Sequence, residues 1–112
     1  MLIFKILRRA EWDAFRRDGA TSGAPIDVAD GYIHFSTAEQ VAATAAKHFA
    51  TESDLVLVAV EAARLGPELK WEASRGGALF PHLYRRLAIA DVVWDKSLPL
   101  GATGHIFPEG VL

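Results

Sequence analysis

Short apolar runs along the chain predict its strands. Residues 2–7 (LIFKIL) and 54–60 (DLVLVAV) are nearly continuous apolar segments rich in β-branched residues, a pattern typical of buried strands. Because the second run shows no alternation with polar residues, we expect it to be a central strand that is covered on both faces. Shorter patterns predict a strand through residues 71–72, after a turn at 66–67, and another around 92–94.

Two amphipathic segments predict helices. In residues 10–18 (AEWDAFRRD), Trp12 and Phe15 are three positions apart and therefore share one face of a helix, and Gly19 is a suitable C-terminal stop. Residues 37–50 carry apolar side chains at four-residue intervals, which predicts a second helix with a single buried stripe.

The predicted order of elements is strand, helix, strand, helix, strand, strand, loop and strand. Residues 20–29 contain Gly and Pro without periodicity and are expected to form a loop, residues 73–87 are the least regular interior stretch, and residues 99–112 resemble a surface tail. No linker divides residues 1–112, so we expect one domain. Two helices serving about five strands exclude a doubly wound repeat and predict an α+β fold, in which a mixed or mostly antiparallel curved sheet packs beside two helices.

Composition narrows the class of protein. The chain has 112 residues, 51% of them apolar, and no cysteine, which excludes disulfides, thiolate zinc sites and a cysteine nucleophile. A net charge of −2 gives no strong signal for nucleic acid or for an anionic membrane. The first residues lack the features of a signal peptide, and no apolar stretch approaches the ~20 residues of a membrane span. We therefore expect a soluble cytoplasmic protein; its oligomeric state stays open.

The stretch DGYIHFSTAEQV places polar side chains where a strand ends. Alternation along the strand puts Tyr32, His34 and Ser36 on one face and leaves the intervening apolar residues for the other. Thr37 and Gln40 have the spacing of a capping box, so a helix begins at the same point. A strand histidine and serine facing a helix N-terminus would suit a phosphate or a ribose. The alternative is a structural histidine at a sheet edge beside ordinary helix capping.

The stretch WEASRGGALFPHLY is the second candidate, and it contains Trp71, Glu72, Ser74, Arg75, His82 and Tyr84. Glu72 can orient a hydroxyl or act as a base, and Arg75 can hold an anion with two hydrogen bonds. His82 can exchange protons near neutral pH, and an aromatic ring here can stack on a flat ligand. The alternative is a surface loop whose glycines serve only a turn and whose aromatic residues belong to the core.

Other familiar sites are absent from the sequence. No nucleophile elbow, phosphate-binding Walker loop or dinucleotide-binding glycine motif occurs. The four histidines (His34, His48, His82 and His105) lack metal-ligand spacing, so we expect no metal.

Four stretches together resemble the bacterial family known as domain of unknown function 952: DGYIHFSTAEQV, DLVLVAVEAARLG, LKWEASRGGALFPHLY and AIADVV. More distantly, the order of segments is similar to the ADP-ribosyltransferase fold, in particular its RNA 2′-phosphotransferase branch, where a strand carries a motif like YIHFS. This resemblance implies nicotinamide adenine dinucleotide (NAD) as the ligand, in a cleft between two small sheets. His34 and Ser36 would line that cleft, and Glu72 or Arg75 would face it.

The chain also departs from that fold. Its first strand offers only Lys5 where the transferases carry a histidine or arginine for a cofactor ribose, and no basic RNA-binding region is present. Two functions are therefore carried forward: an NAD-dependent transferase or hydrolase, and a non-catalytic ligand-binding or interaction module. The expected catalytic residues are His34, Glu72 and His82. The expected ligand-binding residues are Ser36, Thr37, Trp71, Ser74, Arg75 and Tyr84.

Overall fold

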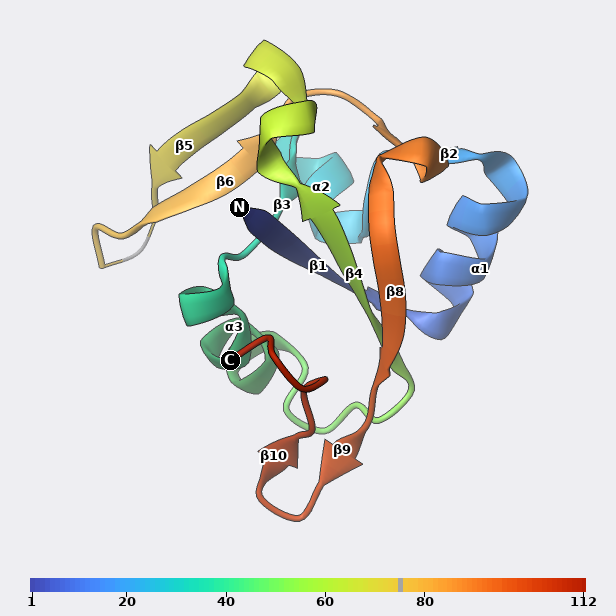
Figure 1. Ribbon diagram of the computed structural model, residues 1–112, viewed down its shortest axis with the longest axis vertical. Helices are drawn as coiled ribbons and strands as arrows, with labels where there is room; N and C mark the ends of the chain where they lie inside the picture. The colour runs from blue at the N-terminus through green and yellow to red at the C-terminus, as the bar shows by residue number, and fades with distance from the viewer. Residues whose placement is uncertain (75) are drawn as a thin grey trace.

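Strand β4 (Leu55–Glu61) is the centre of the fold. The computed structural model in Figure 1 describes residues 1–74 and 76–112, and in it β4 lies between β1 (Leu2–Arg8) and β8 (Val92–Leu98). Both pairings are antiparallel. The prediction of a central strand from the apolar run is confirmed, because every residue of β4 except the last is buried.

The two faces of this sheet pack against different partners. Helix α1 (Arg9–Asp18) covers one face through Trp12 and Phe15, together with strand residues of the second sheet. Helix α3 (Ala38–His48) covers the other face through Val41 and Ala45. Alternate residues of β4 point into these two clusters, so a single strand supports the whole core.

A second antiparallel sheet has the order β3-β6-β5, made of β3 (Ile33–His34), β6 (Leu79–Leu83) and β5 (Leu69–Ala73). After β3 the chain crosses to the central sheet, where Ser36 and Phe4 exchange two backbone hydrogen bonds of 2.8 and 2.9 Å. The second sheet is therefore tied to β1 directly. This connection fixes where the side chains of β3 lie relative to the core.

Two predicted irregular segments contain regular structure. Residues 20–29 were expected to be a loop, but they hold strand β2 (Ala20–Thr21) and most of helix α2 (Pro25–Asp30). The prediction for residues 73–87 was also wrong, because they contain β6 and, at Leu87–Ala88, strand β7, which pairs with β2. In the described part of the chain, three short 3-10 helices complete the main body: Ala62–Arg64, Gly66–Glu68 and Ile89–Asp91.

The C-terminal segment is more ordered than a surface tail. Strands β9 (Leu100–Gly101) and β10 (Gly104–His105) form a small hairpin, and the chain then returns beside α3 (Figure 1). Val111 is only 7% exposed, and Phe107 packs against the same core cluster as α3. The segment therefore closes one side of the core.

The fold class is confirmed at the level of a small α+β domain with antiparallel sheets. The described residues form two three-stranded and two two-stranded sheets in place of one curved sheet, and three α-helices in place of two. Among the described residues, no helix has both the length and the apolar character needed to span a membrane.

Candidate functional site

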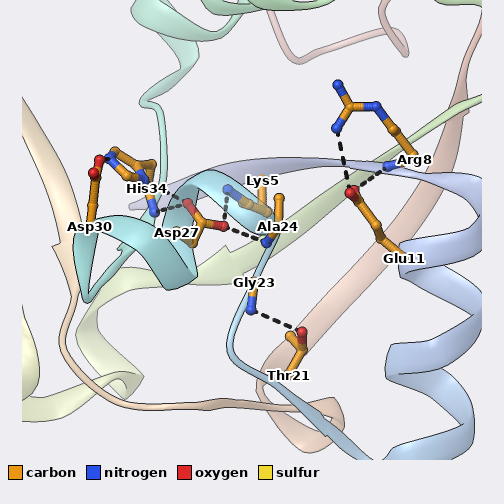
Figure 2. Close-up of polar contacts among 9 residues, drawn as sticks. All are labelled: Lys5, Arg8, Glu11, Thr21, Gly23, Ala24, Asp27, Asp30 and His34. Atoms are coloured by element: carbon orange, nitrogen blue, oxygen red, sulfur yellow. Dashed lines mark hydrogen bonds and ion pairs between the residues drawn. The ribbon is translucent and has the colours of Figure 1, made fainter.

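The buried carboxylate of Asp27 connects α2, β1 and β3 (Figure 2). Its Oδ1 accepts hydrogen bonds from the backbone N–H of His34 (3.1 Å) and from Nδ1 of the same histidine (2.6 Å). Its Oδ2 accepts a hydrogen bond from the N–H of Ala24 (2.7 Å) and lies 2.7 Å from Nζ of Lys5. One side chain thus holds three separate segments of the chain together.

Burial acts on both charges of this ion pair. Burial alone would raise the pKa of Asp27, but the hydrogen bonds from His34 and the charge of Lys5 outweigh it and lower the pKa. Burial lowers the pKa of Lys5, and the Asp27 carboxylate offsets only part of that effect. Lys5 was the only polar candidate of the first strand for holding a ribose. Since it is buried against Asp27, it does not face a ligand.

His34 is held on both sides of its ring. Its Nδ1 contacts Asp27, and its Nε2 lies 3.0 Å from Oδ2 of Asp30, near the end of α2 (Figure 2). The ring can donate hydrogen bonds to both carboxylates only when both nitrogens carry protons. These two contacts fix the position of the side chain, which is 33% exposed.

Five polar or aromatic side chains of one face of the second sheet form a group that we call the two-histidine face: Tyr32, His34, Glu72, His82 and Tyr84. By the strand register, Lys70 and Phe80 lie on the same face, opposite His82 and Glu72. His34 and His82 are cross-strand partners, with ring centroids 5.3 Å apart. Tyr32 stacks on His82 at 4.3 Å and lies 5.1 Å from Tyr84. The intervening strand residues, among them Ile33 and Leu83, face the core.

Glu72 provides the carboxylate of this face. Its Oε1 accepts a hydrogen bond from the hydroxyl of Tyr84 (2.7 Å) and lies 2.8 Å from Nδ1 of His82. The hydrogen bond from Tyr84, followed by that from His82, lowers the pKa of Glu72. In turn, the carboxylate raises the pKa of Tyr84 to about 12. Glu72 is therefore an anion at neutral pH.

Among the described residues, one atom on each side of the Glu72–His82 contact lacks a hydrogen-bond partner, although the His82 side chain is only 7% exposed. Within the part of the chain that the structure describes, neither Oε2 of Glu72 nor Nε2 of His82 makes a hydrogen bond. When Nδ1 of a neutral His82 donates to Glu72, Nε2 carries the lone pair and can accept a proton. The pair thus combines a fixed negative charge with a base, and the two tyrosine rings lie alongside.

Several residues expected to share this site lie elsewhere. Ser36 is buried and its hydroxyl is 2.9 Å from that of Thr44 in α3. Thr37 is the N-cap of α3, where its N–H donates to Oε1 of Gln40 (3.0 Å). Trp71 pairs with Pro81 and, by the alternation of β5, points from the opposite face of the sheet to Glu72.

The turn between β5 and β6 is described only in part. The N–H of Ser74 donates to the carbonyl of Ala78 (3.0 Å), so Ser74 closes the hairpin turn. Arg75, the expected anion contact, lies outside the described residues. Among the residues that are described, no group of three or more metal-ligating side chains could hold a metal ion.

Sequence reasoning missed Asp27, because residues 20–29 were interpreted as a loop, and Asp30, which begins the candidate stretch DGYIHFSTAEQV, was not selected. A signal for helix α2 was present. Pro25 stands at the first helical position and Gly31 follows the last, where it adopts a positive φ of 85°. Interpreted as a helix, the segment would have placed both carboxylates next to the strand of His34.

Comparison with known proteins identifies the family. Residues 6–95 match the family described as "Protein of unknown function (DUF952)". The chain belongs to this family. No match was found among curated proteins. The predicted membership is confirmed, and the more distant similarity to the ADP-ribosyltransferase fold stays a prediction.

Solved structures of protein CC0527 from Caulobacter crescentus share this fold. The X-ray crystal structure is 55% identical in sequence, with a TM-score of 0.90 over 94% of this chain and 92% of that one. The solution NMR structure is 56% identical, with a TM-score of 0.84 over 93% of this chain and 90% of that one. At this identity the arrangement of the two sheets is common to both proteins.

Proposed function

We propose that the two-histidine face binds a nucleotide such as NAD and cleaves the bond between its ribose and nicotinamide. The observation that carries this proposal is the Glu72 carboxylate. One of its oxygens is fixed by Tyr84 and His82, and the other has no hydrogen-bond partner among the described residues. A preorganised anion of this kind stabilises a cationic sugar, because it needs no reorientation when the charge develops.

The chemistry follows from the positions of these groups. The bond between C1′ of the ribose and the nicotinamide nitrogen breaks, and its electron pair leaves with neutral nicotinamide. The sugar then carries positive charge, which Glu72 stabilises. A water or another hydroxyl attacks C1′ and loses its proton to Nε2 of His82, which gives ADP-ribose from water or an ADP-ribosyl O-glycoside from the other hydroxyl. The rings of Tyr32 and Tyr84 would hold the flat nicotinamide or adenine.

A second candidate is a binding module without catalysis, and a specific observation favours it. Lys5 is buried in its ion pair with Asp27, and both ring nitrogens of His34 contact carboxylates. Neither the ammonium of Lys5 nor the ring nitrogens of His34 are therefore free to form hydrogen bonds with a ribose. A protein of this kind would bind the nucleotide on the same face and leave it intact.

The test separates binding from cleavage. Purified protein is titrated with NAD by calorimetry, and nicotinamide release is followed by chromatography. We expect Glu72→Gln to lower the cleavage rate about a hundredfold, the effect of removing one preorganised electrostatic group, while NAD binding persists. Glu39→Gln is the matched control, because Glu39 is an exposed carboxylate on α3. Binding without any nicotinamide release by the parent protein would favour the second candidate, and absence of binding would refute both.

A further inference from the structure

An open hollow of about 270 Å³ adjoins the two-histidine face. It lies where β3 begins and β6 ends, between α2 and the segment that follows β6. Its polar lining includes Ser22, Arg85 and Arg86, and it shares the side chains of Tyr32 and Tyr84 with the two-histidine face. A ligand on that face can therefore extend into the hollow past the tyrosine rings.

The two arginines of the hollow have different partners. Nη1 of Arg85 lies 3.1 Å from Oδ2 of Asp91 and donates to the carbonyl of Arg86 (2.8 Å), so the charge of Arg85 is compensated. Among the described residues, Arg86 makes one long hydrogen bond of 3.4 Å, from Nη2 to the carbonyl of Ala20. No carboxylate of the described residues pairs with it.

The carboxylate of Asp27, which also lines the hollow, does not compensate the positive charge of Arg86. Its two oxygens are occupied by Lys5, Ala24 and His34. The guanidinium of Arg86 is exposed and retains most of its donors, in a geometry that suits two oxygens of a phosphate. The hollow thus presents one uncompensated cation beside two aromatic rings.

We infer that this hollow is a diphosphate subsite, with Arg86 as the anion contact, an inference that rests on the proposed function of the neighbouring face. The volume of the hollow suits one part of a dinucleotide, such as its diphosphate. Pockets that enclose a whole drug-sized ligand measure about 300–1,000 Å³, and this hollow is smaller. The diphosphate of a dinucleotide would lie at Arg86, while its reacting ribose would lie outside, over Glu72.

The experiment measures the binding of four ligands to the parent protein, Arg86→Gln and Arg86→Lys by calorimetry. The ligands are NAD, ADP, inorganic pyrophosphate and nicotinamide riboside, the last of which has no phosphate. Arg86→Gln should weaken the binding of the three phosphate-bearing ligands about ten- to a hundredfold, the loss expected for hydrogen bonds to a charged group. Nicotinamide riboside should bind equally well to all variants, and Arg86→Lys should recover part of the loss.

Arg16→Gln is the control for lost charge, because Arg16 is an exposed arginine on α1. Unchanged binding of phosphate-bearing ligands by Arg86→Gln would overturn the subsite and leave the proposed function standing. Binding of ADP and pyrophosphate through Arg86, with no affinity for NAD or nicotinamide riboside, would support the subsite and refute the proposed function. If no ligand binds, both are wrong. Thermal unfolding of each variant confirms that it is folded.

Discussion

Replacing Asp27 by Asn tests the central ion pair most directly. The substitution keeps the shape of the side chain but removes its charge. The Asp27 side chain is 0% exposed, and that of its partner Lys5 is 8% exposed. In the variant, the new amide group must face either the two N–H donors of His34, or the N–H of Ala24 and the ammonium of Lys5. In either orientation, the NH2 group of the new asparagine faces buried N–H donors and cannot accept their hydrogen bonds.

The magnitude follows from the burial of Lys5. Removing one partner of a buried ion pair costs about 3–5 kcal/mol, because the other charge is left uncompensated. A neutral Lys5 would avoid the charge, but deprotonating a lysine at pH 7 costs about 4.6 kcal/mol from its ordinary pKa of about 10.4. Whether Lys5 stays charged or loses its proton, the expected loss in the free energy of unfolding is therefore about 3–5 kcal/mol. With an unfolding entropy of about 2.1 cal/mol/K per residue, this loss lowers Tm by roughly 13–21 °C for a chain of 112 residues.

The assay is urea denaturation followed by circular dichroism at pH 7 and pH 9. On the route in which Lys5 becomes neutral in folded Asp27→Asn, the unfolded state binds one more proton at Lys5 than the folded state, so the variant gains stability as pH rises toward the ordinary lysine pKa. The stability gap between parent and variant then narrows by at most about 1.4 kcal/mol per pH unit, because burial lowers the pKa of Lys5 in the parent as well. Asp18→Asn is the control, because the Asp18 carboxylate is exposed and pairs only with Arg17 among the described residues.

A double variant decides whether charge is the cause. Lys5→Met combined with Asp27→Asn replaces the pair by an apolar chain of similar length, which removes the buried charge. It should be clearly more stable than Asp27→Asn alone. The reasoning is refuted if the single variant loses less than about 1 kcal/mol, a small fraction of the usual penalty, or if the double variant is no more stable than the single one.

Three further predictions concern the same region. In thermal unfolding, Gly23→Ala should destabilise the fold by about 2–4 kcal/mol and Gly31→Ala by about 1 kcal/mol. Both glycines adopt positive φ, but only at Gly23 would an added Cβ clash with the Asp27 side chain. Equal losses of stability in the two variants would contradict this clash. Ultraviolet titration should show the Tyr84 phenol ionising at about 12, and Glu72→Gln should lower this value because it removes the hydrogen-bonded anion; an unchanged midpoint would argue against that contact. The pKa of Asp27 is lowered in the folded protein, so its ionisation stabilises the fold above a pH of about 3.9, and this stabilisation is lost as pH falls through the pKa of the folded state. Asp27→Asn should therefore make the free energy of unfolding depend less on pH in the acid range. An unchanged acid dependence would contradict this role of Asp27.

Local patterns were sufficient to predict the main elements. The apolar run of β4 indicated a strand buried on both faces, and the alternation of residues 31–37 indicated which residues of β3 face the core. Gly19 ends α1 with a φ of 80°, as its position after a charged helix suggested. These features depend on neighbours in sequence, so sequence alone carries them.

The candidate site was predictable only in part. His34, Glu72, His82 and Tyr84 were selected from two separate stretches, and the structure brings all four to one face. Alternation also placed Ser36 with them, but the chain leaves the second sheet after Phe35, and Ser36 pairs with β1, so its hydroxyl meets α3. A change of pairing partner is a long-range event, which a local pattern does not record.

The amino-acid sequence by itself determined the three long strands β1, β4 and β8, the two longer helices, the α+β class and the residue types of the site, because these depend on the spacing of apolar and polar side chains along one segment. Only the tertiary structure decided that Lys5 is buried against Asp27, that Trp71 lies on the opposite face of its sheet, and that Glu72 meets His82 and Tyr84. Those contacts depend on the register between strands and on the crossing from one sheet to the other. Burial then sets the charge and the available atoms of each side chain.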